Sequence, residues 1–129
     1  MGQKIKPTDA ELRILQVLWE HGPCSVRFVN EAISEEKEVG YTTTLKLMQI
    51  MAEKGIATRD TSSRKHLYEA AVPRSETQHH LLQKLADLAF NGSSVRLAMR
   101  ALGEERISKG EINELRQLLD EMEESASDD

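Results

Sequence analysis

GYTTTLKLMQIMAEKGIATR, residues 40–59, combines an inward stripe with an outward polar face. On a helix, one set of side chains recurs at i, i+3, i+4 and i+7 and is expected to face a core: Thr44, Leu47, Met48 and Met51. The other face carries hydroxyls, one cation and one amide: Thr42, Thr43, Lys46 and Gln49. Such a face suits phosphate oxygens and base edges. The alternative is a surface helix with a solvated polar side.

The ends of this helix carry their own signals. Thr42 or Thr43 is expected to cap its start, where unpaired backbone amides favour anions. Gly55 is expected to end it in the left-handed conformation, after which residues 56–59 predict a strand.

Length and composition indicate one compact domain, or a small domain with an oligomerisation element. The chain has 129 residues, of which 39% are hydrophobic and 30% charged, as in globular proteins. Its short apolar runs predict no membrane span, and its first residues lack the apolar core of a signal peptide. The single cysteine, Cys24, cannot form an internal disulfide, which fits a reducing cytoplasm.

The net charge of −5 is unevenly distributed. Residues 1–73 contain ten basic and ten acidic side chains, whereas residues 74–129 contain seven and twelve. Within residues 41–66 there are five basic side chains and two acidic ones. Because affinity for phosphate depends on the local field, the acidic total does not exclude nucleic acid as a partner.

Two further helices are predicted before residue 40. Thr8 and Glu11 form a capping box ahead of a first helix that ends at His21-Gly22-Pro23. Its expected core stripe is Leu12, Leu15 and Trp19, widened by Ile14, Val17 and Leu18. Ser25 is expected to cap a second helix, whose inward residues are Val26, Val29, Ala32 and Ile33.

After Gly55 the pattern predicts a hairpin, with strands at 56–59 and 64–70 around a polar turn. Three helices followed by a hairpin are typical of the winged helix-turn-helix, in which the third helix reads DNA and the hairpin forms the wing. The expected wing contacts to the DNA backbone are Ser62, Ser63, Arg64 and Lys65. Leu67 is expected to point inward, and Tyr68 to pack or hydrogen-bond. The alternative is a sheet that only covers the core.

The remaining residues predict three helices, at about 75–90, 93–102 and from 108 onward, with Ser108 and Glu111 as a capping box. Their apolar faces are too interrupted to build a core alone, so a second copy is expected to complete it; packing onto the N-terminal domain is the alternative. The expected dimerisation residues are Leu81, Leu85, Leu88, Leu97, Leu102, Ile112, Leu115, Leu119 and Met122. The predicted fold is mainly α with a small β-hairpin: a winged helix-turn-helix domain at 1–73 and a helical dimerisation domain at 74–129.

The chain resembles the penicillinase-repressor (BlaI/MecI) family of bacterial transcription regulators over nearly its whole length. The most specific matches are ELxILxxLWE at 11–20, YTTTL at 41–45 and EKGI at 53–56. The resemblance implies a homodimeric repressor of double-stranded operator DNA with dyad symmetry, and a sensor protease encoded nearby as a further partner. It assigns base-edge and phosphate contacts to Thr42, Thr43 and Lys46, and wing contacts to Ser63, Arg64 and Lys65.

The sequence departs from the family at several positions. Gln49-Ile50 stands where members often carry a basic residue. Classical members are inactivated by cleavage at an Asn-Phe bond, where this chain has Arg100-Ala101; Phe90-Asn91 is in reverse order. Copper-responsive relatives carry paired cysteine motifs, which a single cysteine excludes.

No constellation of residues predicts an enzyme, a metal site or a cofactor. His21 and Cys24 flank a turn, where a space-filling cysteine is the simpler interpretation. His79 and His80 point about 100° apart on a helix, so with His66 they make a poor metal site.

Two functions compete with the repressor. One is a protein-interaction module that uses Leu45 and Ile50 on the outward face of the third helix. The other is a regulator with a small-molecule pocket between its domains. The local basic excess argues against the first, and the low aromatic content of 4% argues against the second.

Overall fold

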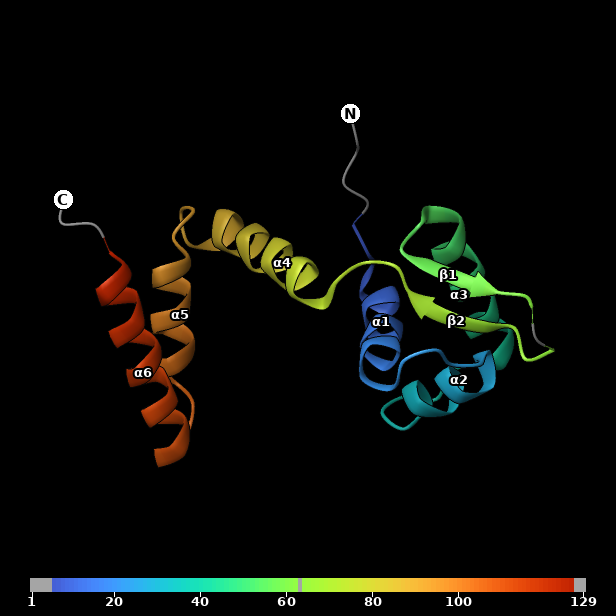
Figure 1. Ribbon diagram of the computed structural model, residues 1–129, viewed down its shortest axis with the longest axis horizontal. Coiled ribbons are helices and arrows are strands. Elements are labelled where there is room, and N and C mark those ends of the chain that lie inside the picture. Colours follow the sequence, from blue (N-terminus) through green and yellow to red (C-terminus); the bar gives the residue numbers. More distant parts are fainter. Residues whose placement is uncertain (1–5, 63, 127–129) are drawn as a thin grey trace. The chain divides into compact units, whose positions relative to one another are not determined.

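The computed structural model describes residues 6–62 and 64–126 (Figure 1). The chain divides into two compact units, Met1–His79 and His80–Asp129. The division falls inside helix α4, whereas the sequence placed it after residue 73. The units are therefore described separately, and α4 contributes its first residues to the N-terminal unit.

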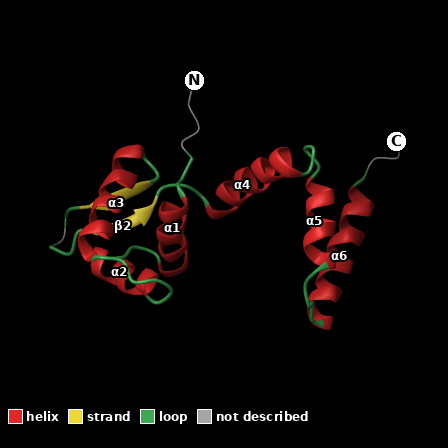
Figure 2. Cartoon of the chain, turned by 180° about the vertical axis from the view of Figure 1, so that it is seen from behind, coloured by secondary structure: helices red, strands yellow, loops and turns green. Residues whose placement is uncertain are grey.

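The N-terminal unit contains three helices and a two-stranded sheet: α1 (Asp9–His21), α2 (Val26–Ser34), α3 (Tyr41–Lys54), β1 (Ala57–Asp60) and β2 (Leu67–Ala70). The strands are antiparallel, with Ala57 opposite Ala70 and Arg59 opposite Tyr68. β1 packs against α3 and β2 against α1 (Figure 2). The winged-helix order predicted from the sequence is confirmed.

The predicted helix caps are confirmed for α1 and α2. Thr8 and Glu11 exchange hydrogen bonds at the start of α1, and Ser25 Oγ accepts from the Phe28 backbone N–H at the start of α2. These side chains satisfy amides that a helix cannot pair internally, so each helix begins where its cap stands.

The core of this unit is made by the inner faces of all three helices and the sheet. Its most buried side chains are Ile14, Leu15, Leu18, Val29, Met48, Met51, Ile56 and Tyr68. On α1, Ile14 and Leu18 are thus more buried than Leu12 and Trp19, whereas Val17 is half-buried; of the expected stripe only Leu15 is fully enclosed. Trp19 lies at the core edge because its indole Nε1 donates to the Val72 carbonyl at 2.9 Å.

The predicted start of α3 is wrong. The helix begins at Tyr41 with Gly40 as its N-cap, so Thr42 and Thr43 lie within the first turn and no side chain caps it. Thr44, fully buried, donates from its hydroxyl to the Gly40 carbonyl at 3.3 Å. At the other end Gly55 adopts φ 85° and ψ 10°, which confirms the left-handed cap.

The hairpin also differs in detail from the prediction. β2 begins at Leu67, so Arg64 and Lys65 lie in the turn rather than in a strand. Tyr68, not Leu67, is the buried residue of β2, with 1% of its surface exposed. The physical reason is its backbone pairing with Cys24, at 2.8 and 2.9 Å, which turns the Tyr68 face of the strand toward the helices.

The C-terminal unit is built from the rest of α4 (Arg74–Ala89), α5 (Ser94–Gly103) and α6 (Lys109–Ser125). Ser93 caps α5, and Ser108 with Glu111 forms the predicted capping box of α6. Among the described residues of this unit, Ala86 is the one fully buried apolar side chain. The three helices therefore form where the sequence predicts them, but they enclose almost no core.

Candidate nucleic-acid interface

The outward face of α3 is available to a ligand. Its four predicted readers, Thr42, Thr43, Lys46 and Gln49, are all exposed. Thr44, Met48 and Met51 on the opposite face are fully buried. Because these residues anchor the back of the helix, the polar face cannot turn inward without unfolding the unit.

Two hydrogen bonds that the sequence did not indicate hold the start of α3 against α2. Asn30 Nδ2 donates to the Val39 carbonyl at 2.8 Å and to Thr44 Oγ1 at 2.9 Å. Ser34 Oγ also bonds the Val39 backbone at 3.3 Å. Asn30 thus fixes the turn that sets the angle between the two helices. Its only signal in the sequence is a polar side chain beside the inward stripe of α2.

The C-terminal end of α3 is tied to α1 by an ion pair. Lys54 Nζ lies 2.9 Å from both carboxylate oxygens of Glu11, whose side chain is 2% exposed. Burial acts to raise the pKa of Glu11, but hydrogen bonds from Lys54 and the Thr8 backbone outweigh it and hold that pKa below its ordinary value. Lys54 is therefore neutralised, and the basic excess of residues 41–66 is smaller than the sequence suggested.

The wing is shaped by its own acidic residue. Asp60 Oδ1 accepts from the Ser62 backbone at 2.9 Å and from the Ser62 hydroxyl at 2.6 Å, and these bonds lower the pKa of Asp60. Ser62 is therefore engaged within the turn. Arg64 and Lys65 are exposed beyond it, and Ser63 lies outside the described residues.

The apolar residues proposed for the rival docking surface are only partly available. Leu45 and Ile50 are both half-buried, and Leu45 packs against the core. Tyr41, which the sequence did not single out as a contact, is 50% exposed at the first position of α3.

The residues considered for chemistry lie apart or are enclosed. Cys24 is buried, its Sγ lies 3.1 Å from the Gly22 carbonyl, and burial raises the pKa of its thiol, which disfavours the nucleophilic thiolate. Within residues 6–62 and 64–126, no three His, Cys, Asp or Glu side chains gather as metal ligands. Nor does any helix in this part of the chain have the length and apolarity to cross a bilayer.

The C-terminal unit exposes the apolar face predicted for dimerisation. Seven of the nine named residues are exposed: Leu81, Leu85, Leu88, Leu102, Ile112, Leu119 and Met122. Leu97 and Leu115 are half-buried. The structure adds exposed residues to this face: Leu82, Val95, Met99 and Leu118.

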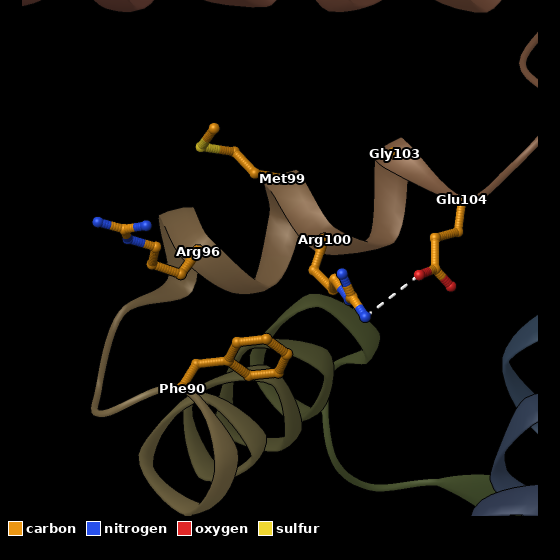
Figure 3. A pocket seen from close by; sticks show the side chains of 6 residues that line it. All are labelled: Phe90, Arg96, Met99, Arg100, Gly103 and Glu104. Atoms are coloured by element: carbon orange, nitrogen blue, oxygen red, sulfur yellow. Dashed lines mark ion pairs between the residues drawn. The ribbon is translucent and has the colours of Figure 1, made fainter.

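An open hollow of about 490 Å³ lies on this unit, lined by Phe90, Arg96, Met99, Arg100, Gly103 and Glu104. Figure 3 shows Phe90 beneath α5 and the Arg100–Glu104 ion pair, 3.3 Å long, at one side. Because Met99 is 64% exposed and half of the lining is charged, the hollow is an open surface feature and not an enclosed ligand pocket.

Three packed helices, a hairpin and an exposed polar face on the third helix define a winged helix-turn-helix protein. Comparison with known sequences narrows this class. Residues 7–121 match the profile of the family described as penicillinase repressor, and the chain belongs to that family.

Relatives of this family resemble the chain over nearly its full length. The transcriptional regulator BlaI of Mycobacterium tuberculosis is 32% identical, over 95% of this chain and 89% of the relative. The penicillinase repressor of Bacillus licheniformis is 24% identical, over 88% and 89%. The methicillin resistance regulatory protein MecI of Staphylococcus aureus is 22% identical, over 87% and 91%.

Two solved structures share the fold of the N-terminal unit. The DNA-binding domain of the repressor BlaI matches with a TM-score of 0.51 at 21% identity, over 59% of this chain and 93% of that one. The monomeric form of Bacillus licheniformis BlaI in complex with the blaP half-operator matches with a TM-score of 0.50, at the same identity and coverage.

Proposed function

We propose that this protein is a homodimeric transcriptional repressor that binds a dyad-symmetric DNA operator and occludes a promoter. The observation that carries the proposal is the exposed face of α3, fixed from behind by a buried stripe in a chain of the penicillinase repressor family. DNA as the partner would place the repressor in the cytoplasm.

The chemistry of this face fits the edges of base pairs. Gln49 can pair with adenine through two hydrogen bonds, Lys46 donates to guanine or phosphate, and the Thr42 and Thr43 hydroxyls donate or accept. The four side chains span two turns of one helix, the length of α3 that fits a major groove. This supports a reading role for the face.

The exposed cations of the wing turn fit the DNA backbone. Arg64 and Lys65 are exposed beside the turn that Asp60 and Ser62 close. Roughly six to ten phosphate contacts per dimer would reduce affinity by about 10³ to 10⁵ between 50 and 200 mM salt.

The exposed apolar face of α4, α5 and α6 supports the homodimer. Leu88, Leu119 and Met122 are 75%, 60% and 55% exposed. A concentration of exposed apolar side chains such as this is typical of a protein interface. Two winged helices joined in this way would read half-sites about 34–36 Å apart, or a multiple of that distance.

The family resemblance implies a sensor protease as a second partner. The aligned bond, Arg100–Ala101, lies inside α5, whose backbone must unwind before a protease can bind it as an extended chain. A dimer that covers α5 would therefore protect this bond.

The experiment measures binding of the purified chain to a duplex from the region upstream of its own coding sequence, and to a random duplex of equal length. Lys46→Ala should weaken binding to the upstream duplex more than to the random one, whereas Arg64→Ala should weaken both about equally. Equal losses for Lys46→Ala on both duplexes would remove Lys46 from the reading role. No binding of the wild type to either duplex would contradict the repressor.

The alternative is a protein-interaction module that uses the outward face of α3. It requires Leu45 and Ile50 to be accessible, but both are half-buried. Unchanged DNA binding after Lys46→Ala and Arg64→Ala would favour this alternative.

A further inference from the structure

An arginine at the wing is held by a histidine instead of a carboxylate. Arg59, on β1, places a guanidinium Nη2 atom 2.9 Å from His66 Nδ1. Arginine can only donate hydrogen bonds, so Nδ1 must be the acceptor and the ring must carry its proton on Nε2. His66 is neutral in this arrangement, and Arg59 keeps its full positive charge.

His66 adopts an unusual backbone conformation. Its φ is +48°, in the left-handed region, which few residues other than glycine occupy and where asparagine, aspartate and histidine are the commonest exceptions. Residues held in such conformations tend to gather at functional sites, where the surrounding structure enforces them. Here His66 directly precedes β2 and carries the acceptor for Arg59.

The strand register separates Arg59 from the acidic residues of the hairpin. Arg59 is opposite Tyr68, whereas the acidic residues lie in the neighbouring pairs, Thr58 with Glu69 and Asp60 with Leu67. Because opposed residues share a face and successive residues alternate, both acids project from the other face. Asp60 is in addition engaged by Ser62. Within the described residues, no ion pair neutralises Arg59.

The face that carries Arg59 is also the one directed toward α3. Ala57 and Tyr68 on this face are buried, and β1 packs against α3. Arg59 lies two residues beyond Ala57, past the edge of the core, and is exposed. Its charge is therefore presented on the side of the wing that faces the reading helix.

We infer that Arg59 is a DNA phosphate contact and that His66 is the residue that positions it; this rests on the DNA-binding function proposed above. A carboxylate in the place of His66 would hold the guanidinium equally well but would cancel its attraction for phosphate. A neutral ring nitrogen orients the guanidinium and leaves its other N–H groups for phosphate oxygens. The contrast within this chain is Lys54, which Glu11 neutralises.

The test measures the affinity of the full chain for a random-sequence 30-base-pair duplex by fluorescence anisotropy between 0.1 and 1 M KCl. Each lost phosphate contact reduces the slope of log affinity against log salt by about 0.9, so Arg59→Gln in both wings of a dimer should reduce it by about 1.8. Over this tenfold range of salt, a slope difference of about 1.8 means that the affinity lost by Arg59→Gln is roughly 60-fold greater at 0.1 M than at 1 M. Arg106→Gln, the same substitution at an exposed site in the loop after α5, is the control and should leave the slope unchanged.

Two substitutions separate the acceptor from the backbone conformation. His66→Gly permits the positive φ but removes the acceptor, so it should reduce the salt slope as Arg59→Gln does, though by less. His66→Asn tolerates the same φ and restores an oxygen close to the place of Nδ1, so its affinity should return to within about twofold of wild type.

An Arg59→Gln slope equal to that of the wild type would overturn the inference. A His66→Gly slope equal to wild type would remove the positioning role of His66. If Arg64→Gln reduces the slope while Arg59→Gln does not, DNA binding stands and only this inference fails. If the wild type does not bind the duplex, the proposed function is contradicted, and the inference about Arg59 is contradicted with it.

Discussion

At the scale of single residues, the contact between Lys54 and Glu11 joins two segments 43 positions apart. It has both hydrogen-bonded geometry and burial, which distinguish it from a surface ion pair such as Arg100–Glu104, where both partners are about 70% exposed. The exposed pair contributes little to stability, whereas the carboxylate of Glu11 is costly to leave unpaired.

Lys54→Met should destabilise the protein. The substitution leaves the Glu11 carboxylate with only the Thr8 cap as a partner, so the free energy of unfolding should fall by about 3 kcal/mol, the low end for a broken buried pair because Lys54 is one-third exposed. Urea unfolding followed by circular dichroism measures this change. Lys46→Met, an exposed lysine on the same helix, is the control and should change stability by less than about 0.5 kcal/mol. Equal effects of the two substitutions would contradict the structural role of Lys54.

The Glu11–Lys54 pair should also make the free energy of unfolding depend on pH. The pKa of Glu11 in the folded state lies below its ordinary value of 4.5, so its contribution is complete above that pH and is lost as pH falls through the folded-state pKa. The difference in unfolding free energy between wild type and Lys54→Met should therefore narrow as the pH falls below 4.5. Urea unfolding curves at pH 7, 5, 4 and 3 measure this difference. A difference in unfolding free energy that stays constant over this range would contradict the link between the Glu11–Lys54 pair and pH.

At the scale of elements, the position of α3 depends on the turn that precedes it. Asn30 is the residue that connects α2, the Val39 carbonyl and Thr44. The exposed face of α3 therefore relies on Asn30 of α2, which contacts the buried side of α3 at Thr44.

Asn30→Ala should loosen the α2–α3 turn. It leaves the Val39 carbonyl with the 3.3 Å Ser34 contact and removes one of two partners of the buried Thr44 hydroxyl, a loss of about 1–3 kcal/mol. The urea midpoint and the affinity for the upstream duplex should both fall. Glu31→Ala, an exposed neighbour on α2, should leave the midpoint within experimental error. An unchanged midpoint for Asn30→Ala would exclude this role.

At the scale of the whole molecule, the two units differ in how much of their apolar surface they enclose. The N-terminal unit buries a continuous core, whereas in the described part of the C-terminal unit only Ala86 is fully enclosed among the apolar side chains. The proposed dimer would stabilise a unit of this second kind, because association favours the folded state.

Leu119→Glu should convert the proposed dimer to a monomer. A charge at the centre of an apolar interface would be buried without a partner, which opposes association. Sedimentation equilibrium should then give a mass near 14.6 kDa instead of twice that value. The salt slope of DNA binding should also fall by about half, since one wing remains per particle. Gln117→Glu, an equal change of charge at an exposed polar position, should stay dimeric. Dimerisation of the Leu119→Glu variant would exclude this face as the interface.

Much of the fold could be predicted from local patterns. The capping boxes at Thr8 and Ser108 and the glycine at position 55 mark helix ends through contacts within four residues, which sequence spacing reports directly. The start of α3 was predicted incorrectly because Thr42 and Thr43 each offer a possible cap, and the choice of Gly40 depends on how Thr44 packs beneath α2.

Part of the candidate site could likewise be predicted from local patterns, and part could not. The polar face of α3 follows from its periodicity, whereas the neutralisation of Lys54 by Glu11 and the orientation of Arg59 by His66 do not. A count of charges along the chain treats all cations alike. Only the folded structure distinguishes a lysine paired with a buried carboxylate from an arginine held by a neutral ring.

The sequence by itself determined which segments are helices and strands, which faces are apolar and to which family the pattern belongs, because these depend on residue type and on spacings of two to four positions. The tertiary structure alone decided the partners: Glu11 for Lys54, Asn30 for Thr44, and Cys24 for the strand that buries Tyr68. These contacts join residues 14 to 44 positions apart, and they form only when the core has brought their helices and strands together.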